Sequence, residues 1–218
     1  MKCILYFIIT IVLLSCKLQK QATQDSKNSP SFSIENNLTE VESSIINDFI
    51  NVELKGDLYK NYRELQYIII EESFKKNKSI DYLYSEKEWL PISKKLTKKE
   101  VDKIFFLDSL QTQKIKLELK NEEEYHWKVS DFKNIKVNLL KREELRKMIQ
   151  TITLFNDSAR LVFYLSKPLI IDRDHAFLSY EIDKCSYICT NLTRFTVLMK
   201  MENGKWVKDQ YYEDGVFN

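Results

Sequence analysis

The chain has 218 residues, which is long enough for one domain with a sizeable core and barely enough for two. Its 34 Lys and Arg nearly balance 32 Asp and Glu, so the charge does not indicate a nucleic-acid partner. With 3 Gly and 3 Pro, the composition argues against a glycine-rich phosphate loop or a long disordered chain, and no cofactor is expected.

The chain opens with the features of an export signal. A short positive start precedes an apolar run over residues 3–14, which is shorter than the roughly 20 residues of a membrane-spanning helix. Leu13, Leu14 and Ser15 then lead to Cys16, and this site resembles the lipobox of bacterial lipoproteins. We therefore expect residues 1–15 to be removed as a signal peptide and Cys16 to be acylated. An ordinary cleaved signal with a chance cysteine and an uncleaved anchor helix are the alternatives.

The stretch after the signal is polar and has no hydrophobic period. We read residues 16–38 as the lipidated Cys16 with a flexible tether, because Pro30 and runs of Lys, Gln, Ser and Asn do not form a packed element. Acyl chains on Cys16 would hold the chain stably at a membrane. Residues 39–218 are then expected to form a single globular domain.

The first half of that domain is expected to be mainly helical. Thr39 and Glu42 form a capping box that begins an amphipathic helix ending at Gly56. The apolar run 65–70 is typical of a buried strand. A short helix over 80–89 should be limited by Pro91.

A second capping box begins the next expected helix. Thr97 and Glu100 form it, and the helical register continues to about Gln113. Residues 115–119 and 135–139 alternate as strands do, and residues 143–151 resemble a short helix.

From residue 160 onward the pattern is that of a β-meander. The strands are expected over residues 161–165, 175–182, 193–201 and 205–212, and Asn203-Gly204 is a strong hairpin signal. The sequence therefore predicts an α+β fold, with N-terminal helices packed on one face of a C-terminal antiparallel meander of about four to six strands.

Two cysteines belong to the folded domain. Cys3 lies in the signal and Cys16 at the lipidation site, which leaves Cys185 and Cys189. An exported protein usually pairs two such cysteines in a disulfide. A redox pair and half of a metal site are alternatives, but a zinc site would need two further ligands.

Few residues are candidates for chemistry. Asp172 and Asp174 are candidate metal ligands, because carboxylates suit divalent cations, although acids are also common in turns. His175 is a candidate general base, but the sequence shows no partner nucleophile for it. His126 has no obvious partner in the sequence either. The acidic run 122–124 is most simply a solvated turn.

Four aromatic residues form a candidate binding platform, namely Trp127, Trp206, Tyr211 and Tyr212. For Trp206, which directly follows the expected hairpin, packing on the sheet is the simpler interpretation. No motif of a serine hydrolase, zinc protease or dinucleotide-binding protein is present.

The last third of the chain resembles a group of uncharacterised small lipoproteins and exported proteins common in Bacteroidetes. The matching features are Leu165 to Ile170, Asp172, Ala176, Cys185 to Cys189 and Asn203 to Trp206, with Ile45 to Phe49 and Leu96-Thr97 nearer the front. The resemblance implies the envelope compartment and this type of fold. It implies no catalytic residue.

We therefore expect a membrane-anchored cell-envelope lipoprotein that acts as a non-catalytic binding module for a protein or a small molecule. Two alternatives are an immunity-type or structural lipoprotein that acts on a partner protein, and a hydrolase with an unrecognised site. Lys17 directly after Cys16, without a following acidic run, favours an outer-membrane position that faces the periplasm.

Overall fold

The computed structural model describes residues 37–56, 59, 67–133, 135–151, 159–186 and 188–213. These residues belong to the compact unit Asn37–Asn218. The predicted signal peptide and tether, including Leu13, Leu14, Ser15 and Cys16, lie outside the described residues.

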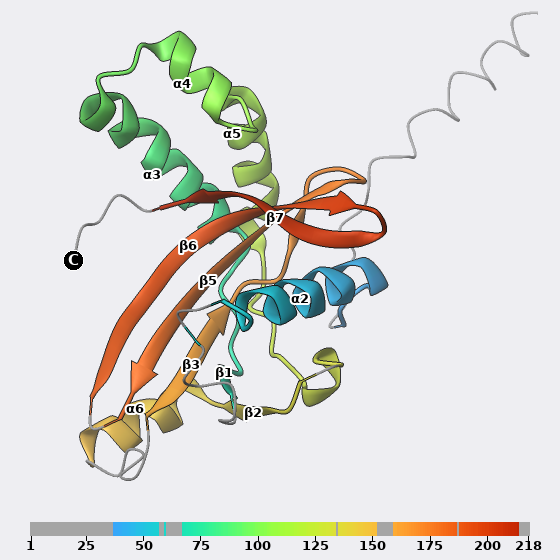
Figure 1. Ribbon diagram of the computed structural model, residues 1–218, viewed down its shortest axis with the longest axis vertical. Helices are drawn as coiled ribbons and strands as arrows, with labels where there is room; N and C mark the ends of the chain where they lie inside the picture. Colours follow the sequence, from blue (N-terminus) through green and yellow to red (C-terminus); the bar gives the residue numbers. More distant parts are fainter. Residues whose placement is uncertain are drawn as a thin grey trace, which may run out of the picture. The chain divides into compact units, whose positions relative to one another are not determined.

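The described strands form one mixed sheet (Figure 1). The strand order is β2-β1-β3-β5-β6-β7, and β4 pairs with β5 beside this path. The strands are β1 (Tyr67–Ile70), β2 (Val137–Leu140), β3 (Arg160–Leu165), β4 (Leu169–Ile170), β5 (His175–Cys185), β6 (Cys189–Glu202) and β7 (Lys205–Tyr212).

The C-terminal strands form the predicted antiparallel meander. β3 pairs with β5, β5 with β6 and β6 with β7, all antiparallel. The sheet continues beyond the meander, because β1 pairs in parallel with both β3 and β2. The α+β class is confirmed, and the two additional strands both precede the meander in the sequence. The apolar run that ends at Ile70 is buried, as expected.

The helices cover both faces of the sheet, so the prediction that they cover one face was wrong. Figure 1 shows α2 lying across the sheet, α3, α4 and α5 gathered at one end of it, and α6 at the other end of the long strands. The helices are α2 (Glu40–Glu53), α3 (Asn77–Lys94), α4 (Lys98–Ile104), α5 (Ser109–Glu118) and α6 (Arg142–Gln150), with short 3-10 turns η2 (Leu119–Asn121) and η3 (Val129–Asp131).

The alternation of side chains along β5 explains the two-sided arrangement. Ala176 and Leu178 face the hydrophobic core under α2, to which α2 contributes Ile46 and Phe49. Phe177 faces the opposite way and packs with the cluster of α3 to α5. A third cluster, under α6, contains Leu145 and residues of β1, β3 and β5. A strand buried on both faces needs helices on both faces.

Thr39 and Glu42 form the predicted capping box of α2. In contrast, α3 passes through Pro91 and ends at Lys95, which adopts a left-handed conformation with φ of 53°. Pro91 removes one backbone donor shortly before the helix ends, and its own carbonyl accepts the N–H of Leu96 at 3.1 Å. The prediction that Pro91 limits the helix was wrong.

Two further predictions between residues 97 and 119 were wrong. The expected helix 97–113 is broken into α4 and α5, because Asp108 caps α5 by accepting the Gln111 N–H at 2.8 Å. The expected strand 115–119 is the end of α5 and the following turn. Ile115 and Leu119 lie four residues apart on its inner side, while Leu117 is 73% exposed. This spacing fits a helix as well as a strand.

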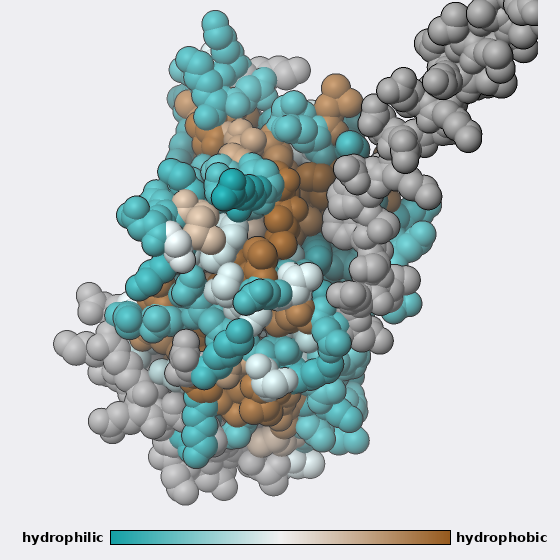
Figure 2. Space-filling model, turned by 90° about the vertical axis from the view of Figure 1, so that its right-hand side faces the viewer, coloured by the Kyte–Doolittle hydropathy of each residue, from teal (hydrophilic) through white to brown (hydrophobic). Residues whose placement is uncertain are grey.

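The surface of the domain is mixed in polarity on the face that Figure 2 shows. Hydrophobic and hydrophilic side chains are interspersed on the face seen in Figure 2. Scattered exposed apolar side chains are normal for a folded protein, so apolar character does not single out a site on that face.

Candidate functional site

The sheet face that carries α3 and α6 holds a group of polar side chains. β5 contributes Glu181 and Asp183, β3 contributes Tyr164, and β6 contributes Asn191 and Arg194. In the strand register Glu181 lies opposite both Tyr164 and Arg194, and Asp183 lies opposite Asn191. We call these five residues the polar face.

Glu181 links the polar face to α3. Its Oε1 accepts from Lys78 Nζ at 2.6 Å and from the Tyr82 hydroxyl at 3.0 Å, and lies 3.2 Å from Arg194 Nε. The Glu181 side chain is only 16% exposed. Two cations and a phenol therefore balance a largely shielded carboxylate.

Asp183 has a different environment. Its carboxylate accepts from Asn191 Nδ2 at 2.9 Å and from the Tyr164 hydroxyl. Burial raises the pKa of Asp183, and the hydrogen bond from Asn191 opposes this rise. Burial also raises the pKa of Tyr164, and the negative charges of Asp183 and Glu181 add to that effect.

A β-bulge brings Asn191 opposite Asp183. Ile182 pairs with Thr193, but the register then shifts and Asp183 pairs with Asn191. Leu192 is left without a partner in this ladder. A regular register would place Leu192 beside Asp183, so the bulge replaces an apolar neighbour by an amide.

Aromatic rings flank the polar face. Phe74 stacks on Tyr164 with ring centroids 5.9 Å apart and an interplanar angle of 11°. Lys78 Nζ lies 3.3 Å from the centroid of Phe74. This cation–π contact places the lysine between an aromatic ring and the Glu181 carboxylate. Lys78 and the rings form a rigid side of the site.

A disulfide closes the strand pair beside the polar face. Cys185 ends β5, Cys189 begins β6, and the two are joined, as expected from the sequence. Cys185 is fully buried among residues under α6, including Leu145 and Val162. The disulfide therefore fixes the hairpin end two residues from Asp183.

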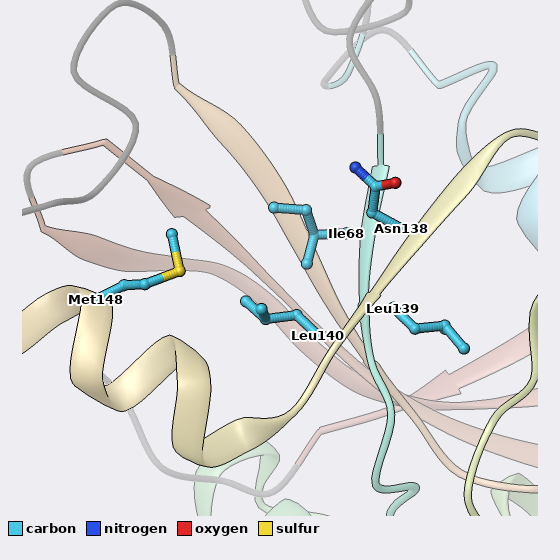
Figure 3. A pocket seen from close by; sticks show the side chains of 5 residues that line it. All are labelled: Ile68, Asn138, Leu139, Leu140 and Met148. Carbon is cyan, nitrogen blue, oxygen red and sulfur yellow. The ribbon is translucent and has the colours of Figure 1, made fainter.

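A pocket of about 270 Å³ lies near α6, on the same sheet face as the polar face but toward the edge formed by β1 and β2. It is lined by Ile68, Asn138, Leu139, Leu140 and Met148. In Figure 3, Ile68, Leu140 and Met148 point into the same space, while Leu139 points away from it. The lining is mainly apolar, so this pocket suits an apolar group and offers few groups for chemistry.

Asp172 and Asp174 lie in an exposed turn. Asp172 Oδ1 accepts the Asp174 N–H at 2.8 Å and lies 3.0 Å from His175 Nδ1. The His175 ring packs on Phe106 with centroids 4.5 Å apart. Within the described ranges, no group of three or more His, Cys, Asp or Glu is placed to hold a metal ion. The turn contacts account for both acids.

The other candidates are dispersed. His126 is exposed and lies 3.3 Å from a Glu71 oxygen. Glu122 is half-buried, and burial raises its pKa, so it is not a fully solvated turn residue as expected. Its carboxylate accepts the Asn77 N–H at 3.4 Å. The sequence candidates therefore do not converge.

The predicted aromatic platform does not form. Trp127 and Trp206 are both 2% exposed, and Tyr212 is fully buried, whereas Tyr211 is 40% exposed. Trp206 packs in the core under α2, as expected for a half-buried strand, and its Nε1 donates to Ser44 Oγ at 3.1 Å.

Sequence reasoning missed the polar face. The expected strand 175–182 ended one residue before Asp183, and no weight was given to carboxylates two residues apart on one strand. That spacing places Glu181 and Asp183 on the same face, and Arg194 lies across the hairpin. The cross-strand combination was the available signal.

Comparisons with known proteins add no identification, because no family model, curated protein or solved structure matches the chain. No helix of the part that the structure describes is long and apolar enough to cross a membrane.

Proposed function

We propose that this protein is a bacterial envelope lipoprotein that is anchored through Cys16 and acts by binding through the polar face. The anchor rests on the order of an apolar run, Leu13, Leu14, Ser15 and then Cys16. Its position is at the outer membrane, facing the periplasm, and the tether gives the domain freedom to reach a partner.

The observation that carries the binding role is the placement of five polar side chains on one face of a rigid sheet. Strands hold these groups with little freedom, and Glu181 and the disulfide fix both sides of the group. A hydrolase is less well supported than a binding protein, because its candidate residues Asp172 and Asp174 lie in an exposed turn. The partner is a protein or a small molecule and not a nucleic acid.

Mass spectrometry of the mature N-terminus tests the anchor. We expect an acylated Cys16 as the first residue, and we expect Cys16→Ser to prevent both acylation and cleavage. Cys3→Ser is the matched control, because it removes a thiol from the signal without changing the cleavage site. A mature chain that begins elsewhere without acylation would contradict the anchor.

Cross-linking in intact envelopes tests the binding role. A photo-reactive residue in place of Arg194, a member of the polar face whose side chain is 35% exposed, should capture a specific partner. The same residue at exposed Lys99 on α4 is the control, because it lies on a different element. Equal capture from both positions would count against the polar face as the binding surface.

A further inference from the structure

The pocket beside α6 has a mainly apolar wall. Ile68 of β1, Leu140 of β2 and Met148 of α6 point into the same space (Figure 3). These side chains also pack in the hydrophobic cluster under α6, so that cluster backs the pocket. An apolar cavity of roughly 150 Å³ holds a benzene molecule. The pocket volume of about 270 Å³ therefore has room for roughly ten aliphatic carbons.

The wall of this pocket is built on regular secondary structure and leaves apolar surface open to a ligand. Ile68 is paired with Asn138 in the parallel ladder of β1 and β2, which holds both lining residues in place. Leu140 and Met148 are only half-buried. An aliphatic chain in the pocket would remove their remaining apolar surface from water, which favours binding.

Positive charge surrounds this apolar wall. Between residues 136 and 147 the chain exposes four cations and two acids. One of the acids, Glu143, already pairs with Arg146 at 2.9 Å. The exposed lysines stand beside lining residues in the sequence, namely Lys136, Lys141 and Lys147. The pocket thus combines an apolar interior with a rim that favours an anion.

We propose that this pocket binds the aliphatic chain of an anionic amphiphile, whose head group lies among the lysines of the rim. The wall of Ile68, Leu140 and Met148 suits the chain, and the excess of positive charge selects an anionic head group over a neutral one. The source of this chemistry is either a free fatty acid or an anionic phospholipid. The pocket is separate from the polar face and does not depend on the binding role proposed for it.

Photo-labelling of the full-length protein in phosphatidylcholine vesicles tests the proposal. The probe is decanoate with a diazirine at the end of its chain, and mass spectrometry locates the label. We expect saturable labelling of the segments that contain Leu140 and Met148. Unlabelled decanoate and phosphatidylglycerol compete as the two sources, and the one that competes at the lower concentration identifies the source. Decanol is the matched neutral probe and should compete at least about tenfold less well.

Variants locate the chain in the pocket. Met148→Gln should reduce labelling by about tenfold, because it places an amide among apolar side chains. Ile149→Gln is the matched control, since the neighbouring Ile149 is 39% exposed and does not line the pocket. Labelling that Met148→Gln leaves unchanged, or that falls on other segments, would overturn the proposal.

A second variant tests the head group without a change in the core. Lys136 is exposed and lies two residues before Asn138, the spacing that puts residues on one side of an extended chain. Lys136→Gln should weaken competition by decanoate several-fold and leave decanol unchanged, while Lys99→Gln on α4 should alter neither. Equal competition by decanol and decanoate in the wild-type protein would overturn the proposal. That result would not bear on cross-linking at Arg194 or on the acylation of Cys16.

Discussion

Asp183 on β5 lies opposite Asn191 on β6 because the bulge removes Leu192 from the strand pairing, and the two side chains are joined by a hydrogen bond of 2.9 Å. A carboxylate that faces an amide keeps spare acceptors, whereas one that faces Leu192 would have only apolar contact on that side. Burial raises the pKa of Asp183, and the pairing supplies the hydrogen bond from Asn191 that opposes this rise.

Asn191→Ala should raise the pKa of Asp183 further, because the hydrogen bond from Asn191 favours the ionised carboxylate. The free energy of unfolding should fall by about 1 kcal/mol, since a partly shielded acceptor loses its donor. Carbon-detected NMR titration of the Asp183 carboxyl measures the first effect, and urea unfolding the second. Thr190→Ala, on the same strand but exposed, is the control, and an equal change there would contradict the assignment.

Asp183→Asn should make the protein more stable at neutral pH, because it removes a carboxylate whose ionisation is disfavoured by burial. A carboxyl whose pKa is raised in the folded state stabilises fully below its unfolded pKa, and this contribution is lost as pH rises through the folded pKa. The uncharged variant avoids that loss. Urea unfolding at acidic and neutral pH checks the prediction. A variant that is destabilised at neutral pH would indicate a structural role for the charge.

Glu86→Gln should remove a separate pH dependence. Burial raises the pKa of Glu86 to about 7, and its carboxylate accepts the Glu213 N–H at 2.7 Å. The unfolded carboxyl ionises near 4.5, so wild-type stability should fall as pH rises from 4.5 to 7. Gln accepts the same N–H without charge, and the variant should be about 1–2 kcal/mol more stable at pH near 8, after allowance for solvent screening.

Unfolding in urea near pH 4 and near pH 8 gives the comparison for Glu86. Glu88→Gln is the control, because that residue is exposed on the same helix. If both variants show the wild-type pH slope, burial of Glu86 does not govern this stability window.

Loss of the Cys185–Cys189 disulfide should lower the free energy of unfolding by about 2 kcal/mol, which is the chain-entropy value for such a short loop. The double variant Cys185→Ala, Cys189→Ala removes it without leaving a thiol. Thermal unfolding with and without a reductant measures the effect. The reductant should lower the wild-type midpoint and leave the double variant unchanged, and an unaffected wild-type midpoint would contradict the prediction.

The C-terminal half of the fold was predictable because its signals are local. Asn203 and Gly204 adopt positive φ values of 52° and 78° at the β6–β7 turn, as the dipeptide indicates. The alternation of residues 175–182 identifies β5, because successive side chains of a strand point to opposite faces of the sheet. The disulfide followed from the export context and the number of cysteines.

The errors arose where tertiary contacts decide between local alternatives. Ile115 and Leu119 fit a strand or a helix equally well, and the packing of α5 on α3 decides for the helix. The complete polar face, with Asn191 opposite Asp183, could not be predicted for a related reason. It needs the register of three strands and a bulge at Leu192, and neither the register nor the bulge is marked by a short motif.

The three partners of Glu181 come from two elements, since Lys78 and Tyr82 belong to α3 and Arg194 belongs to β6. Loss of the negative charge of Glu181 would leave Lys78 and Arg194 close together without the carboxylate that attracts both. One carboxylate therefore joins α3 to the sheet, and a change that removes its charge would weaken the attachment of that helix.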